Sequence, residues 1–143
     1  NSARSQMAEG LLRAMYGDRY EAYSAGVDPT AVDPRAVRAM SEIGIDISGQ
    51  RSKSTQEFLD TVFDQAVTVC DRARQACPIC STEIELPART PRAREVIHRS
   101  FLDPAATRGS KEEEMQAFRK VRDAMKDWIS QTFGDDGRTL FSP

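Results

Sequence analysis

The chain has 143 residues, of which 39% are apolar and 29% charged, and a formal net charge of −2, which is the composition of one ordinary globular domain. No region gathers the basic residues that nucleic acid or an anionic membrane requires, and no apolar run approaches the roughly 20 residues of a membrane span, so both partners are excluded. The chain start lacks the basic-then-apolar pattern of a signal peptide, and we therefore expect a cytoplasmic protein.

The first half of the chain shows mainly helical periodicity. Apolar residues at helical spacing predict a helix over residues 5–16. The two tyrosines within residues 19–25 favour a short strand there. Asp33 is an N-cap followed by Pro34 at the first helical position, and it begins a second helix whose apolar stripe runs to Gly44.

Helices and strands alternate in the second half. The expected elements are a short helix with capping-box spacing at 54–57, a buried strand over 66–69, a polar loop over 81–94, a short strand over 95–98, and a long amphipathic helix from a capping box at Ser110 to Gly134. We expect a disordered tail over 134–143. The pattern predicts one α/β domain over residues 1–133 around a mostly parallel sheet.

A candidate anion site opens the chain. Asn1, Ser2, Ala3, Arg4 and Ser5 run directly into the first predicted helix. They combine small residues, backbone amides at a helix N-terminus and a guanidinium, all of which favour a bound anion. A simple N-cap accounts for the same residues, so the local pattern leaves both interpretations open.

The three cysteines lie within eleven residues, at Cys70, Cys77 and Cys80. An odd number so closely spaced is a poor disulfide framework and indicates redox chemistry or metal binding. Together with His98 they could ligate zinc, but Cys-x6-Cys-x2-Cys is not a usual finger spacing, and we predict no metal site. Cys70 could also be a buried structural thiol. Cys80 is assigned no role.

A specific string, Asn-Ser-Ala-Arg-Ser-Gln-Met-Ala-Glu-Gly, fills residues 1–10. Further strings accompany it: Tyr-Ser-Ala-Gly at 23–26, Asp-Ile-Ser at 46–48, Val-Thr-Val-Cys at 67–70, Cys-Pro at 77–78, Asp-Pro-Ala at 103–105 and Phe-Arg-Lys-Val-Arg-Asp at 118–123. Through these strings the chain resembles the arsenate reductases of the low-molecular-weight tyrosine phosphatase superfamily, to about residue 133. The resemblance implies a three-layer α/β sandwich with a mostly parallel four-stranded sheet.

The family's anion-binding loop is Cys-x5-Arg. With Arg4 as its arginine, the nucleophilic cysteine stands three residues before Asn1, preceded by the family's first strand, and neither is part of this sequence. We therefore expect an N-terminally truncated chain that is inactive as given. Its unpaired strand edges would also favour aggregation.

The resemblance implies a cysteine relay. The nucleophilic thiolate attacks arsenate while the loop amides and Arg4 hold the oxyanion, and Ser5 lowers the pKa of the thiol. Asp103 protonates the leaving oxygen. Cys70 then attacks the cysteine–arsenic adduct, releasing arsenite, and Cys77 forms a disulfide with Cys70 that thioredoxin reduces. Phosphate and sulfate would bind as analogues, no tightly bound cofactor is implied, and a monomer is expected.

Residues 70–77 carry a further expectation. A helix over this segment would hold the α-carbons of the two cysteines about 10 Å apart, whereas a disulfide requires roughly 4.4 to 6.8 Å. The segment should therefore unwind when the disulfide forms.

Some relatives bind potassium near the loop through positions that match Asn1, Glu9 and Ser24, together with an acidic residue. This chain has Lys53 at the acidic position. Lysine would supply the positive charge itself, so the resemblance predicts insensitivity to potassium.

Two alternative functions stay open. A low-molecular-weight tyrosine phosphatase shares the loop and the Asp-Pro element but has no need for paired Cys70 and Cys77, so the pair favours the reductase. An inactive fragment or oxyanion-binding module is the other alternative. Asp103 before Pro104 could also be a mere turn or cap.

Overall fold

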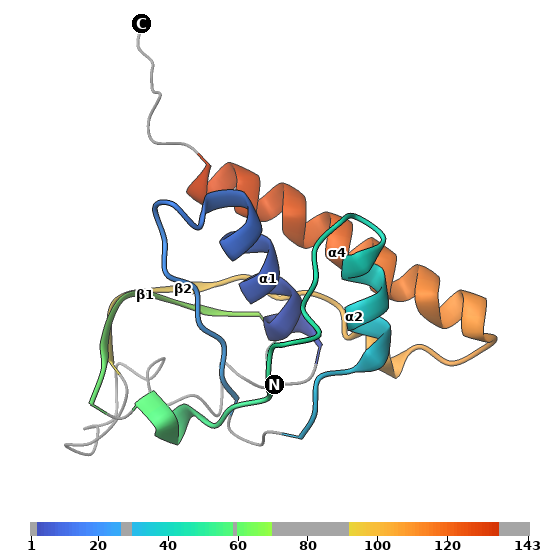
Figure 1. Cartoon of the computed structure of the whole chain (residues 1–143), viewed down its shortest axis with the longest axis horizontal. Helices are drawn as coiled ribbons and strands as arrows, with labels where there is room; N and C mark the ends of the chain where they lie inside the picture. Colours follow the sequence, from blue (N-terminus) through green and yellow to red (C-terminus); the bar gives the residue numbers. More distant parts are fainter. Residues whose placement is uncertain (1–2, 27–29, 59, 70–91, 135–143) are drawn as a thin grey trace, which may run out of the picture.

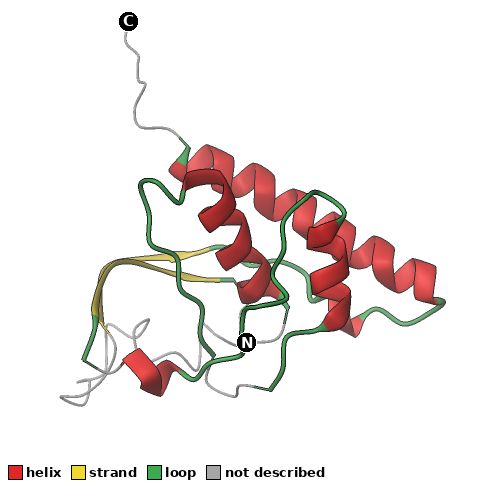
Figure 2. Cartoon of the chain, in the orientation of Figure 1, coloured by secondary structure: helices red, strands yellow, loops and turns green. Residues whose placement is uncertain are grey.

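The structure is a computed structural model that describes residues 3–26, 30–58, 60–69 and 92–134. Its elements, in chain order, are α1 (Arg4–Tyr16), α2 (Pro34–Ser41), the 3-10 helix η1 (Thr55–Phe58), β1 (Val62–Thr68), β2 (Arg92–His98), the 3-10 helix η3 (Pro104–Ala106) and α4 (Lys111–Phe133). Helices α1 and α2 pack against the long α4 (Figure 1). The carboxyl ends of the paired strands reach the N-terminal end of α1 (Figure 2).

β1 and β2 form a parallel pair. Val62 lies opposite Arg92 at one end of the ladder, and Thr68 lies opposite His98 at the other. Parallel pairing was expected, but both strands are longer than predicted, since they begin at Val62 and Arg92 and not at residues 66 and 95. The first half of β1 alternates between exposed and partly buried residues. The first half of β1 therefore lacks the continuous apolar run from which the buried second half of the strand was predicted.

The strand predicted over residues 19–25 is wrong. Within the described residues the sheet has two strands, and this segment forms no ladder with either of them. Its end makes an isolated parallel bridge between Gly26 and Ser54. A strand requires backbone partners along its length, whatever its side-chain propensity. We expected a four-stranded sheet whose first strand is not part of this sequence; the described part of the chain contains two of its strands.

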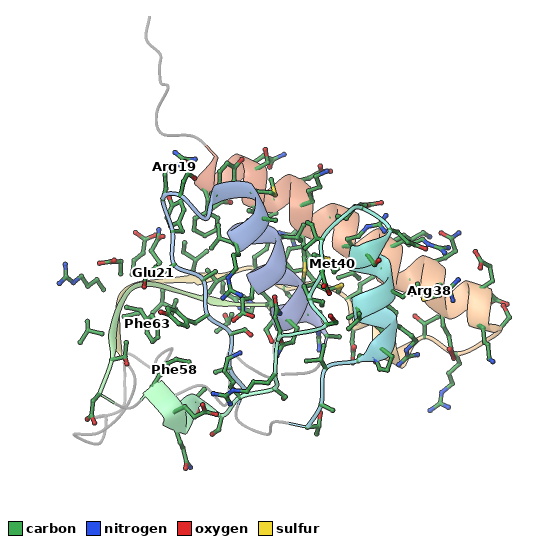
Figure 3. All side chains as sticks on the ribbon, in the orientation of Figure 1. Arg19, Glu21, Arg38, Met40, Phe58 and Phe63 are labelled. Atoms are coloured by element: carbon green, nitrogen blue, oxygen red, sulfur yellow. The ribbon has the colours of Figure 1, made fainter. Side chains whose placement is uncertain are left out.

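Aromatic packing holds this irregular segment in place. The Tyr23 ring lies 5.7 Å from that of Phe58 and 6.0 Å from that of Phe63, measured between centroids. Phe58 and Phe63 are themselves 5.6 Å apart and lie close together in Figure 3. The contacts connect η1 and β1 to the segment that ends at Gly26.

Helix caps explain where the helices begin. The Asp33 side chain accepts a hydrogen bond from the Arg35 amide, with Pro34 at the first turn of α2, as predicted. Ser110 and Glu113 form the expected reciprocal capping box at the start of α4.

Two other helix predictions need correction. The apolar stripe of α2 was expected to run to Gly44, but the helix ends at Ser41, and Gly44 closes the following turn at φ +80°. The box expected at 54–57 is a 3-10 turn in which the Ser54 hydroxyl accepts from the Gln56 amide. That amide lies one position too early for a capping box.

The core lies between α1, α2 and α4. Its largest fully buried side chains include Met7, Leu11, Met40, Ile47, Phe118, Met125 and Ile129. Met40 faces inward from α2 and Arg38 outward (Figure 3). Each such side chain contributes roughly 1.5–3 kcal/mol on burial. The core therefore fixes α1, and with it the candidate anion site at the N-terminus of α1.

Several predictions concern residues outside the described ranges: Asn1, Ser2, Cys70, Cys77, Cys80, the unwinding of residues 71–76 and the tail after Gly134. In the part of the chain that is described, no three His, Cys, Asp or Glu side chains gather as a metal site. No helix there is long and apolar enough to cross a membrane.

Candidate functional site

The candidate anion site begins at the N-terminus of α1. Ala3 is the N-cap residue, and no side-chain hydrogen bond caps this helix in the described structure. The Met7 amide donates to the Ala3 carbonyl at 2.9 Å, which is the first bond of the helical ladder. The amides of a first helical turn have no acceptor within the helix and carry the positive end of its dipole. The simple N-cap interpretation therefore loses support at Ala3.

Arg4 and Asp103 lie together at this helix end. One Arg4 guanidinium nitrogen, Nη2, lies 3.8 Å from Asp103 Oδ2. The other, Nη1, donates to the Phe101 carbonyl at 3.0 Å. The Arg4 side chain is 22% exposed and that of Asp103 45% exposed, so solvent reaches both groups. Two residues far apart in sequence thus meet, as the resemblance implies.

Asp103 is also a cap. Its Oδ1 accepts from the Ala105 amide at 3.0 Å, and Pro104 occupies the first position of η3. Asp103 therefore caps η3 and also contacts Arg4. The second carboxylate oxygen is the one that faces the guanidinium.

Backbone hydrogen bonds place this carboxylate beside the end of β1. The Arg99 amide donates to the Thr68 carbonyl at 2.9 Å, and the Phe101 amide donates to the Val69 carbonyl at 3.0 Å. These bonds continue the pairing of the chain past the end of β2. In open α/β sheets, ligands bind outside the carboxyl ends of the strands. Cys70 follows Val69 in sequence but lies outside the described residues.

The Phe101 side chain anchors this segment in the core. It is buried, and its ring meets that of Trp128 edge to face, with 6.1 Å between centroids. The carbonyl that accepts the hydrogen bond from Arg4 therefore belongs to a residue that core packing holds in place. A guanidinium, a helix N-terminus and a solvent-accessible carboxylate together suit a tetrahedral oxyanion whose leaving oxygen takes up a proton.

The family model of low molecular weight phosphotyrosine protein phosphatases matches residues 1–137. The chain belongs to this family. It is 42% identical over 138 residues to an arsenate reductase of Halalkalibacterium halodurans, which covers 96% of this chain and 91% of that protein.

Solved structures agree with the family assignment. An arsenate reductase of Archaeoglobus fulgidus matches with a TM-score of 0.66 at 28% identity and covers 94% of each chain. An arsenate reductase in a phosphate-binding state matches with a TM-score of 0.61 at 25% identity, over 94% of this chain and 90% of that one. The phosphatase-like α/β fold predicted from the sequence is confirmed.

The resemblance predicts that Lys53 replaces a potassium ion near Glu9, and the structure places these two side chains together. Glu9 is only 5% exposed. Its carboxylate oxygen lies 3.5 Å from Lys53 Nζ and 3.8 Å from Arg13 Nη2. Lys53 also donates to the Arg51 carbonyl at 3.0 Å. Because the carboxylate already faces two cationic groups, these residues do not fit a potassium ion at Glu9.

The resemblance also assigned Ser24 and Asn1 to the site near Glu9 and Lys53. The Ser24 hydroxyl is buried and has no hydrogen-bond partner among the described residues. Asn1 lies outside them. The structure thus brings Glu9 and Lys53 together, while it gives Ser24 no bonded partner in the described set.

Sequence reasoning missed the residues that hold the Lys53 segment. Gln6 is fully buried on α1 and donates to the Arg51 carbonyl at 2.9 Å. Gln50 donates to the Gln6 side-chain oxygen at 2.7 Å and to its carbonyl at 3.0 Å. A glutamine on a helix ordinarily indicates an exposed face. No pattern in the sequence distinguished Gln6 from a surface residue.

Proposed function

We propose that this chain belongs to an enzyme that reduces arsenate to arsenite. The observation that carries the proposal is the meeting of Arg4 and Asp103, 3.8 Å apart at the N-terminus of α1. This arrangement supplies positive charge for an oxyanion and a carboxyl group for its leaving oxygen. Two relatives that are 42% and 37% identical to this chain are named arsenate reductases.

The first step joins sulfur to arsenic. A thiolate at the family's nucleophile position attacks arsenate, which Arg4 and the amides of the first helical turn hold. Asp103 gives its proton to the leaving oxygen, so that water departs and a sulfur–arsenic bond remains. Developing negative charge lies against the guanidinium and the positive end of the helix dipole, and this proximity lowers the barrier.

The later steps move two electrons to arsenic. The Cys70 thiolate attacks the nucleophile's sulfur, and the electron pair of the sulfur–arsenic bond stays with arsenic, which leaves as arsenite. Cys77 then attacks Cys70 and releases the nucleophile as a thiolate. Two thiols have become one disulfide, and one As(V) has become As(III).

The proposal also covers the localisation, oligomeric state, cofactor and reductant of the enzyme. We infer a cytoplasmic monomer without a tightly bound cofactor, in which thioredoxin reduces the Cys70–Cys77 disulfide. Exchange between dithiol and disulfide proteins fits this chemistry, and reducing compartments keep such cysteine pairs available for turnover.

The experiment compares two polypeptides. One is the 143-residue chain, and the other is the same chain preceded by the family's first strand and a cysteine three residues before Asn1. Arsenate-dependent oxidation of reduced thioredoxin is expected only from the extended protein. Cys70→Ser and Cys77→Ser should abolish turnover, whereas the matched control Cys80→Ser should keep it. Sulfate binding without turnover by both proteins would instead mark an oxyanion-binding module.

The phosphatase alternative is tested with the same proteins. Hydrolysis of p-nitrophenyl phosphate requires the loop and Asp103 but neither Cys70 nor Cys77. A protein that hydrolyses this ester efficiently, and that leaves thioredoxin reduced in the presence of arsenate, is a phosphatase and contradicts the proposal.

A further inference from the structure

The last pair of the parallel ladder is also joined through its side chains. Thr68 lies directly opposite His98 in the register of β1 and β2. The Thr68 hydroxyl oxygen is 2.6 Å from His98 Nδ1, which is a short hydrogen bond whichever of the two groups carries the proton. Thr68 is 5% exposed, so water competes little for this bond.

Other polar pairs between these strands are weaker. Gln65 donates to Glu95 at 3.4 Å, and Arg94 lies 3.8 Å from Asp64, with side chains that are 78% and 93% exposed. Exposed pairs of this kind contribute little and can re-form after a slip. The partly buried Thr68–His98 bond requires these two residues to be opposite, so it specifies the register that the exposed half leaves weak.

The strand register sets the position of the segment that runs from β2 to Asp103. The Thr68 carbonyl accepts from the Arg99 amide, and the next carbonyl, that of Val69, accepts from the Phe101 amide. The Phe101 carbonyl in turn accepts from Arg4. A chain of hydrogen bonds therefore leads from the side-chain pair to the guanidinium.

The size of the effect can be estimated from strand geometry. A slip by one residue moves one strand about 3.3 Å along the other. A displacement of that size would carry Asp103 out of reach of Arg4, since the two side chains are already 3.8 Å apart. Misplacement of a reacting group by about 1 Å can cost roughly 100-fold in rate.

We propose that Thr68 and His98 are positioning residues for the reaction. Their bond keeps the carboxyl ends of β1 and β2 level, so that Asp103 stays beside Arg4. This inference rests on the proposed function, because it assigns the pair a role in that same site. Neither residue contacts the oxyanion in this account.

The test uses the nucleophile-bearing protein described above. Thr68→Val removes the hydroxyl but keeps the shape and the strand propensity, while Thr68→Ser keeps the hydroxyl. We expect Thr68→Val to lower kcat for arsenate about 100-fold with KM within about twofold, because proton donation is displaced while Arg4 stays anchored on α1. Thr68→Ser should restore kcat to within about twofold. Gln65→Ala, on the same strand, should change neither constant.

Nuclear magnetic resonance reads the bond directly. His98 is the only histidine of the chain, so its imidazole nitrogens give a single set of signals. Thr68→Val should shift the Nδ1 signal and the Arg4 side-chain N–H signals, whereas Thr68→Ser should shift them little. Thermal unfolding then compares the stability of the Val and Ser variants.

Two results separate the proposals. If Thr68→Val shifts the imidazole signal but leaves kcat and the Arg4 signals unchanged, the positioning role is wrong. If even the unsubstituted protein fails to turn over arsenate, the proposed function fails. The Arg4 signals then still decide whether the pair sets the geometry of the site.

Discussion

The Glu9–Lys53 ion pair allows a direct test of how much a buried charge pair contributes to the stability of this protein. Glu9 is 5% exposed and the Lys53 side chain 11% exposed, with 3.5 Å between their charged atoms. At an effective dielectric constant of about 20, two unit charges at this distance attract by about 5 kcal/mol. Lys53→Met would leave Glu9 with Arg13 as its cationic contact, at 3.8 Å.

We expect Lys53→Met to lower the free energy of unfolding by about 3 kcal/mol, since a buried carboxylate that loses its partner typically costs about 3–5 kcal/mol. The remaining attraction between Arg13 and the Glu9 carboxylate keeps the loss at the lower end of this range. In a domain of this size, the change corresponds to a fall in Tm of about 10 °C. Urea denaturation of the variant and the parent at neutral pH measures it.

Two further variants serve as controls. Arg13, whose side chain is 54% exposed, should tolerate Arg13→Met with a loss of about 1 kcal/mol, because exposed pairs contribute little. The double variant Glu9→Gln with Lys53→Met removes both charges and should recover most of the stability. If Lys53→Met costs less than Arg13→Met, or the double variant is less stable than Lys53→Met alone, the reasoning about the buried pair is refuted.

The same structure supports three other predictions. Replacing sodium with potassium should leave turnover unchanged, because Lys53 already lies at the Glu9 carboxylate; a clear rise in activity would contradict this. A hydrogen bond from Arg119 is the main reason that the pKa of Glu42 is lowered to about 2 from its ordinary 4.5. The stability that this pair contributes is present above pH 4.5 and is lost as the pH falls towards 2, so Glu42→Gln should flatten the dependence of unfolding free energy on pH in that window. Hydrogen exchange over residues 71–76 should differ between oxidised and reduced protein, and identical protection in both states would count against unwinding.

Local signals in the sequence predicted those parts of the fold that short-range chemistry decides. The cap at Asp33 and the capping box at Ser110 set two helix starts correctly, because a cap satisfies backbone amides within a few residues. The apolar face of α4 could also be predicted, because the residues on that face contact the core along the whole helix.

Features that depend on distant partners were harder to predict. Residues 19–25 have strand-like composition but lack a ladder, because the described strands pair with one another and not with this segment. The exposed beginnings of β1 and β2 became strands only through their mutual pairing. Propensity describes a single segment, whereas a ladder is a property of two.

The candidate site shows the same division. The resemblance indicated Arg4 and Asp103, and the structure brings them together. The resemblance did not indicate that Arg4 donates to the Phe101 carbonyl, because any residue could supply that carbonyl. It also did not indicate the contact between Thr68 and His98, which depends on strand register. Residue type identifies chemical groups, but only the fold shows which of them meet.

In the proposed mechanism, reduction of arsenate ends in a Cys70–Cys77 disulfide. The most direct test incubates the reduced, nucleophile-bearing protein with arsenate in the absence of thioredoxin and maps its disulfides by mass spectrometry. We expect one arsenite to be released for each protein molecule, together with a disulfide between Cys70 and Cys77. Release of arsenite with both thiols still free, or a disulfide that instead requires Cys80, would contradict it.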